Sequence, residues 1–180
     1  MDYSAIQRQV LRLVSQVLKK PKLIFEDKLI LEHALNLWSG CLLHSGGLFD
    51  EFVKPIDADV DTNQFVLSGL LYCRYETVRE EFRQCLAAIC RRAPDQTQPE
   101  KTKPLDFILK LLSVNFSLIS EYPCKQYFEL FCELLDKHFL EVASKRQLNS
   151  QDTGAAGQVI DSEALLSTVI ERIREENQQA

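Results

Sequence analysis

The sequence predicts an all-α fold in which antiparallel helix pairs stack as a short α-solenoid, with an irregular helical bundle as the alternative. Glycine and proline number only six each, while the helix-forming residues Leu, Glu, Gln, Lys and Arg are frequent. Apolar residues recur at spacings of three and four along most of the chain. The helical segments are joined in pairs by short turns, which favours antiparallel neighbours. No exact sequence period is visible, so the solenoid prediction depends on this pairing.

The N-terminal half is predicted to contain four substantial helices. The first covers 3–19 and ends before Pro21, and its apolar stripe consists of Ile6, Val10, Leu13, Val14 and Val17. The second begins at Asp27, a favourable N-cap residue, and the glycines of HSGGLF end it. Its stripe consists of Leu29, Ile30, Ala34, Leu37, Trp38 and Cys41. A short helical turn follows in DEFV, and the third and fourth helices cover 62–71 and 76–92.

The C-terminal half is predicted to begin with a surface loop at about 94–103, because this stretch is polar and rich in proline. Pro104 suits the first turn of the next helix, which covers 105–120. A long aromatic-rich helix follows over about 124–146. The predicted domain organisation is a helical-repeat domain over 1–146, a flexible linker over 147–161, and a C-terminal helix over 162–180 that frays at its end.

Composition argues against several classes of partner. The formal net charge is −5, so we expect no broad attraction to nucleic acid or to anionic lipid. No apolar run approaches the roughly 20 residues that a bilayer-spanning helix needs. The first 20 residues do not have the pattern of a signal peptide. We therefore expect a cytoplasmic or nuclear location, no membrane partner, and six cysteines that stay reduced.

Three of the six cysteines lie close together in the sequence, at Cys73, Cys85 and Cys90, which raises the question of a metal or thiol site. A spacing of five residues turns a helical side chain by about 140°, so Cys85 and Cys90 cannot hold one ion from the same helix. Structural zinc sites use ligand pairs two to four residues apart, and no C-x-x-C occurs here. Cys41 and His44 form half a site without a second half. We expect no metal and no cofactor, and interpret the cysteines as small apolar core residues.

Sequence motifs for catalysis are also absent. The chain contains no phosphate-binding glycine loop, no H-E-x-x-H and no G-x-S-x-G. A cysteine nucleophile needs a nearby base, and His138, six residues after Cys132 on one helix, lies about 240° round that helix from it. We therefore expect this chain to have no catalytic residue and no enzymatic activity of its own.

The string LLYCRYETVREEFRQCLAAIC resembles the second half of a HEAT or armadillo-type repeat. In that motif a valine–arginine pair opens the second helix, as Val78 and Arg79 do here, and small or apolar residues follow. Val78 would fill the seam between the two helices, and Arg79 would reach an acidic side chain or a helix C-terminus nearby.

A wider stretch, about residues 60–146, is similar to the helical-repeat portions of the very large ubiquitin carboxyl-terminal hydrolases of the fat-facets type. The stretch includes DVDTNQFVLSGLLYC and LISEYPCKQYFELFCELLDKH. The resemblance implies that the chain is a non-catalytic scaffold segment of a cysteine-type deubiquitinase. That family's nucleophile stands in a Gly-Asn-Thr-Cys-Tyr-like string and its histidine in a Gly-His-Tyr-like string. No cysteine or histidine here stands in either string, so no catalytic residue can be transferred.

Three functional hypotheses follow. The first is a protein-interaction module whose partner binds Glu80, Gln84 and Arg91, on the face of the helix 76–92 that lies opposite its apolar stripe. Other repeats of the same parent chain would be further partners. The second is a small thiol-dependent hydrolase with an unrecognised site at Cys90 or Cys124. The third is a purely structural spacer or oligomerisation segment.

Overall fold

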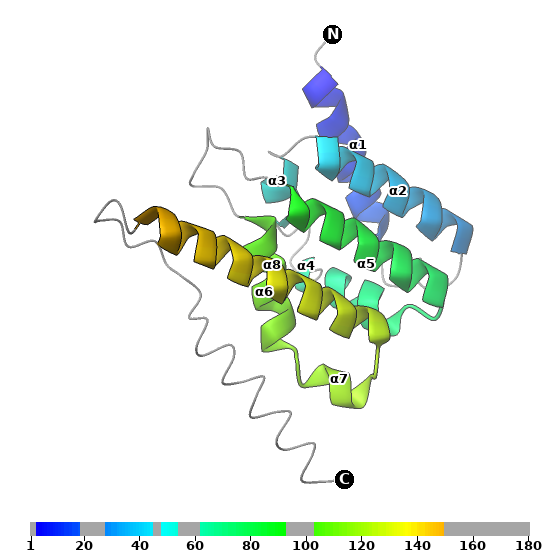
Figure 1. The fold of residues 1–180 in the computed structure, drawn as a ribbon. Coiled ribbons are helices and arrows are strands. Elements are labelled where there is room, and N and C mark those ends of the chain that lie inside the picture. Colours follow the sequence, from blue (N-terminus) through cyan, green and yellow to red (C-terminus); the bar gives the residue numbers. More distant parts are fainter. Residues whose placement is uncertain (1–2, 19–27, 45–47, 54–61, 93–102, 150–180) are drawn as a thin grey trace. The chain divides into compact units, whose positions relative to one another are not determined.

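The computed structural model describes residues 3–18, 28–44, 48–53, 62–92 and 103–149. The described residues contain only helices, turns and bends, which confirms the all-α prediction (Figure 1). The chain divides into two compact units, residues 1–134 and residues 135–180. The elements are α1 (Tyr3–Leu18), α2 (Lys28–His44), α3 (Phe49–Val53), α4 (Thr62–Leu67), the π-helix η3 (Ser68–Tyr72), α5 (Glu76–Arg91), α6 (Pro104–Val114), α7 (Leu118–Glu121) and α8 (Lys125–Asn149).

Most predicted helices are present within one to three residues of their predicted ends. Pro104 occupies the first turn of α6, where the missing N–H of proline costs no hydrogen bond. The predicted loop at 94–103 lies outside the described residues except for residue 103, and so does the C-terminal helix at 162–180. Of the linker at 147–161, residues 147–149 form the end of α8, and the remainder lies outside the described residues.

The single helix predicted over 105–120 is wrong, because the structure has two helices there. α6 ends at Val114, and Asn115 leaves the helical region with φ −102° and ψ 16°. The Asn115 side-chain amide donates to the Leu111 carbonyl oxygen at 2.8 Å, which supplies a partner at the end of the helix. The chain resumes as α7 only at Leu118.

Two of the predicted apolar stripes are also wrong in part. In α1, Ile6 and Leu13 are exposed, and the buried residues are Leu11 and Leu18. In α2, Ala34 and Trp38 are buried as predicted. However, three residues of the predicted stripe are exposed, and three others take their place in the core. The exposed residues are Leu29, Ile30 and Leu37, and the buried ones are Leu31, Leu35 and Leu42.

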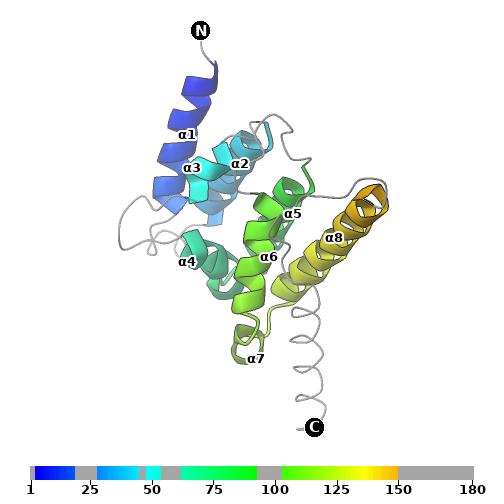
Figure 2. The same cartoon turned by 90° about the vertical axis from the view of Figure 1, so that its left-hand side faces the viewer.

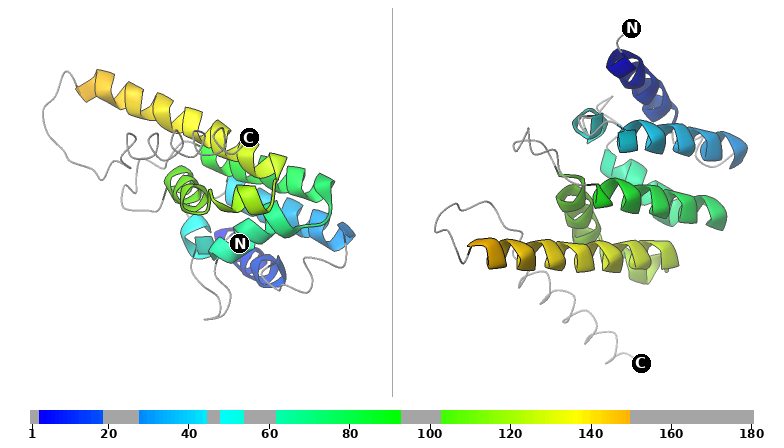
Figure 3. Two further views of the ribbon diagram at one scale, coloured as in Figure 1. Left: turned by 90° about the horizontal axis from the view of Figure 1, so that it is seen from below. Right: turned by 45° about the horizontal axis from the view of Figure 1, so that its top comes forward.

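An aromatic cluster forms the centre of the first unit. Trp38 of α2 has no exposed surface, and its ring lies 5.0 Å from Phe52, 5.7 Å from Phe65 and 5.8 Å from Phe82, measured between centroids. Phe65 and Phe82 meet edge to face at 5.3 Å. Such edge-to-face contacts add to the stability that burial of the rings provides. The cluster joins α2, α3, α4 and α5, and α2 and α5 lie side by side (Figures 1 and 3).

The chain between α4 and α5 contains a π-helical turn, η3, that brings backbone close to the aromatic cluster. Gly69 lies in this turn, and a Cβ atom placed on it would be 2.4 Å from Cε1 of Phe82. No other residue could occupy this position without displacing the ring. The sequence predicted a continuous helix over 62–71, and the structure instead changes from α-helix to π-helix at Ser68.

α6 packs beside α5 (Figure 2) and also contacts the first part of α8. The Tyr127 hydroxyl donates to the carbonyl of Leu112, and the rings of Phe116 and Phe131 lie 5.1 Å apart. Tyr127 is fully buried, and this burial raises its pKa. These contacts fix residues 125–134 of α8 within the first unit. They thereby position the polar side chains described next.

Candidate functional site

The candidate site lies between α5 and the first part of α8, and α5 positions it. The apolar side chains Val78, Phe82, Leu86 and Ile89 are buried against the rest of the unit. At about 100° per residue, this arrangement turns Glu80, Gln84 and Arg91 to the opposite face. Glu76 in the first turn and Arg91 in the last turn also suit the helix dipole. The predicted amphipathic pattern of this helix is therefore confirmed.

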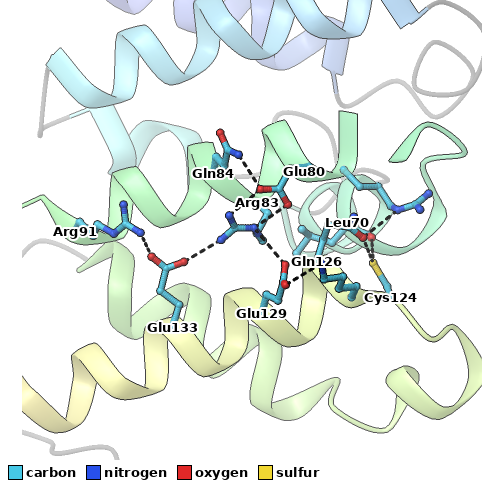
Figure 4. Close-up of polar contacts among 11 residues, drawn as sticks. Leu70, Glu80, Arg83, Gln84, Arg91, Cys124, Gln126, Glu129 and Glu133 are labelled. Atoms are coloured by element: carbon cyan, nitrogen blue, oxygen red, sulfur yellow. Dashed lines mark hydrogen bonds and ion pairs between the residues drawn. The ribbon is translucent and has the colours of Figure 1, made fainter. Parts of the chain in front are cut away.

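Arg83 is the centre of a polar network, which we call the α5–α8 network (Figure 4). Its guanidinium donates twice to Glu80, from Nε to Oε2 at 3.0 Å and from Nη2 to Oε1 at 2.8 Å. Its remaining nitrogen, Nη1, donates to Glu133 Oε2 of α8 at 2.9 Å. Glu129 of α8 lies 3.9 Å from Nε. The Arg83 side chain is only 17% exposed, so these charge-assisted bonds are partly shielded from water.

The structure brings the three predicted binding residues into this one network. Gln84 Nε2 donates to Glu80 Oε1 at 2.7 Å, and Arg91 donates to the second carboxylate oxygen of Glu133. Gln84 is exposed and the Arg91 side chain is 63% exposed. Glu80 Oε1 therefore accepts from both Arg83 and Gln84, while Oε2 accepts from Arg83. All three residues therefore have partners within the chain.

Sequence reasoning missed Arg83, Glu129 and Glu133. The i,i+3 spacing of Glu80 and Arg83 on one helix was a readable signal. Glu133 lies fifty residues from Arg83 in the sequence, and nothing local connects the two.

The Arg83 guanidinium lowers the pKa of Glu80 to about 2, first through the hydrogen bond between them. The hydrogen bond from Gln84 and the charges of Arg83 and Lys125 lower it further, while partial burial acts in the opposite direction. The same hydrogen bond raises the pKa of Arg83. Both groups are therefore charged at neutral pH. These ion pairs can hold α5 against the first part of α8.

A second polar junction lies at the N-terminal end of α5. Arg79 Nη1 donates to the Cys73 carbonyl oxygen at 2.5 Å, which ends η3, and Nε donates to Gln126 Oε1 at 3.4 Å. The prediction that Arg79 would reach a helix C-terminus is confirmed. The Cys124 thiol lies 2.7 Å from the Leu70 carbonyl oxygen and 3.3 Å from Gln126 Oε1. Figure 4 shows Leu70, Cys124 and Gln126 of this junction beside the α5–α8 network. It ties the π-helical turn to both α5 and α8.

All six cysteines are free thiols. Cys73, Cys90 and Cys124 are buried, as predicted for small apolar core residues, whereas Cys41, Cys85 and Cys132 are only partly buried. Burial raises the pKa of Cys41, Cys73 and Cys85. The hydrogen bond to the Tyr75 carbonyl and the charges of Arg79 and Arg74 lower the pKa of Cys73 by smaller amounts. A raised pKa leaves little thiolate at neutral pH, which is the reverse of what a cysteine nucleophile requires.

The part of the chain that the structure describes shows no metal site. No cluster of three or more His, Cys, Asp or Glu side chains there could hold a metal ion. A small cavity of about 20 Å³ lies between α1, α2, α4, η3 and α5, and apolar surface lines it. That volume accommodates about one water molecule, and the lining offers it no polar partner. No helix among the described residues is long and apolar enough to cross a membrane.

Comparisons with known proteins found no match to the chain, whether among family models, curated sequences or solved structures. The candidate site is therefore interpreted from its own geometry.

Proposed function

We propose that the chain is a non-catalytic protein-interaction segment built as a short α-solenoid, and that it serves as a scaffold in a large ubiquitin-specific protease. The observation that carries the proposal is the row of α2, α5 and the first part of α8. α2 packs against α5, and Arg83 and Arg91 extend the row to α8. The helices α1, α4 with η3, and α6 precede these three in the sequence, as the first members of helix pairs would.

The outer face of α5 is the proposed contact surface. Gln84 and Arg91 are exposed on this face, and each uses only part of its donors within the chain. Arginine is enriched at the centres of protein interfaces. Glu80 contributes by holding Gln84 in place. The role in deubiquitination rests on the resemblance of residues 60–146 to the repeat regions of the fat-facets type, and the catalytic domain would lie elsewhere in the parent chain.

The thiol-hydrolase alternative has less support. Cys90 is 2% exposed and Cys124 is 8% exposed, so neither sulfur is open to a substrate. Reaction with a ubiquitin probe that carries a C-terminal electrophile decides between the two functions. We expect no covalent adduct with the purified chain, and an adduct on any cysteine would replace the scaffold proposal by an enzymatic one.

The contact surface is tested with the double variant Gln84→Ala/Arg91→Ala. Leaving Glu80 and Arg83 intact keeps most of the α5–α8 network. The matched control is Gln64→Ala/Lys110→Ala, which removes one exposed amide and one exposed cation from α4 and α6. Proteins from a cell extract that bind the original chain and the control, but not the α5 variant, would support the surface. Equal binding by all three chains would show that Gln84 and Arg91 make no contact.

The scaffold role in a larger protein is tested separately. An antibody raised against residues 62–92 should detect a very large polypeptide in cell extracts, and the same polypeptide should react with the ubiquitin probe. Detection of only a polypeptide of about 180 residues would contradict the parent-protease part of the proposal without affecting the contact surface.

A further inference from the structure

We draw no further inference here: the strongest candidate, the exposed apolar face of α1 that carries Ile6 and Leu13, is a helix face for which nothing in the structure shows what covers it.

Discussion

Replacement of Gly69 by alanine tests the packing of the π-helical turn against the aromatic cluster. The added Cβ would lie 2.4 Å from Cε1, 2.6 Å from Cδ1 and 2.9 Å from Cζ of Phe82. Ordinary contact between two carbon atoms is about 3.5–4.0 Å, so the ring or the turn must move by about 1 Å. Phe82 is 1% exposed and packed against Trp38 and Phe65, so its ring cannot turn into solvent, and the cavity that it lines together with Gly69 holds only about 20 Å³.

The net effect combines two opposing contributions. Overpacking of a well-filled core costs about 1–3 kcal/mol. Replacing glycine by alanine within a helix returns about 0.5–1 kcal/mol, because the unfolded chain loses conformational freedom. We therefore expect Gly69→Ala to lower the free energy of unfolding by about 1–2 kcal/mol. For a chain of this length, each kcal/mol corresponds to a fall in Tm of roughly 2–4 °C.

Gly40→Ala is the matched control, because Gly40 lies within α2 and nothing is within 4 Å of its added Cβ. Gly40→Ala gains the stability of alanine over glycine in a helix and suffers no clash. We therefore expect this variant to be more stable than the original chain by about 0.5–1 kcal/mol. Urea unfolding followed by tryptophan fluorescence measures both variants. The chain has a single tryptophan, Trp38, which is fully buried beside Phe82 and therefore reports on this core directly.

A double-mutant cycle identifies the cause of the change. Phe82→Leu removes the ring that the new Cβ would meet, so Gly69→Ala should cost less in that background than in the original chain. If Gly69→Ala unfolds at the same urea concentration as Gly40→Ala, the close approach of η3 to Phe82 is wrong. Equal costs of Gly69→Ala in both backgrounds would likewise exclude the ring as the source of the strain.

Three further predictions concern the polar contacts and the thiols. The folded-state pKa of Glu80 lies below its ordinary value of 4.5, so its pairing with Arg83 stabilises the fold fully above about pH 4.5, and this contribution is lost as the pH falls toward about 2. Acid unfolding of Glu80→Gln should therefore depend less steeply on pH than acid unfolding of the original chain. An unchanged acid transition would contradict the network. Arg79→Met should lower the free energy of unfolding by about 1–2 kcal/mol, because the Cys73 carbonyl at the end of η3 loses its charged donor. Thermal unfolding measures this change, and a neutral effect would show that water replaces the guanidinium. Cys73 and Cys85 should react with iodoacetamide at pH 7 far more slowly in the folded chain than in urea, because burial raises both thiol pKa values. Mass spectrometry of tryptic peptides measures the rates, and fast labelling of the folded chain would contradict the burial.

The existence of the helices was predictable from the sequence, but the break in the segment 105–120 was not. The apolar spacing continues through Phe116 and Ile119, so the pattern gives no sign of an interruption. The break depends on Asn115, whose amide competes for the Leu111 carbonyl. Asparagine makes such bonds in some helices and faces solvent in others. Only the local geometry decides between these outcomes, so periodicity could not.

The choice of buried face was less predictable than the helix itself, as α1 shows. This helix has apolar residues at positions 6, 10, 11, 13, 14, 17 and 18, which is more than one stripe can use. Either Leu11 and Leu18 or Ile6 and Leu13 could have faced the core. Both pairs have the same spacing of seven, so the outcome is decided by which neighbours the rest of the fold provides.

In the candidate site, too, the orientation of the side chains was predictable from the local sequence, but their partners from a distant part of the chain were not. The outward orientation of Glu80, Gln84 and Arg91 follows from helix periodicity, since each lies opposite Val78 and Phe82. Their partners do not follow from it, because Glu133 reaches α5 only through the packing of α8.

This difference matters for how the surface is tested. Removal of all three predicted residues would also take from Arg83, a cation that is only 17% exposed, its two hydrogen bonds to Glu80, and lost binding could then reflect lost stability. Replacing Gln84 and Arg91 while leaving Glu80 and Arg83 intact distinguishes an effect on binding from an effect on stability. Weaker binding with unchanged unfolding would assign the outer face of α5 to a partner. Weaker binding that is matched by weaker folding would assign these residues to the stability of the helix stack.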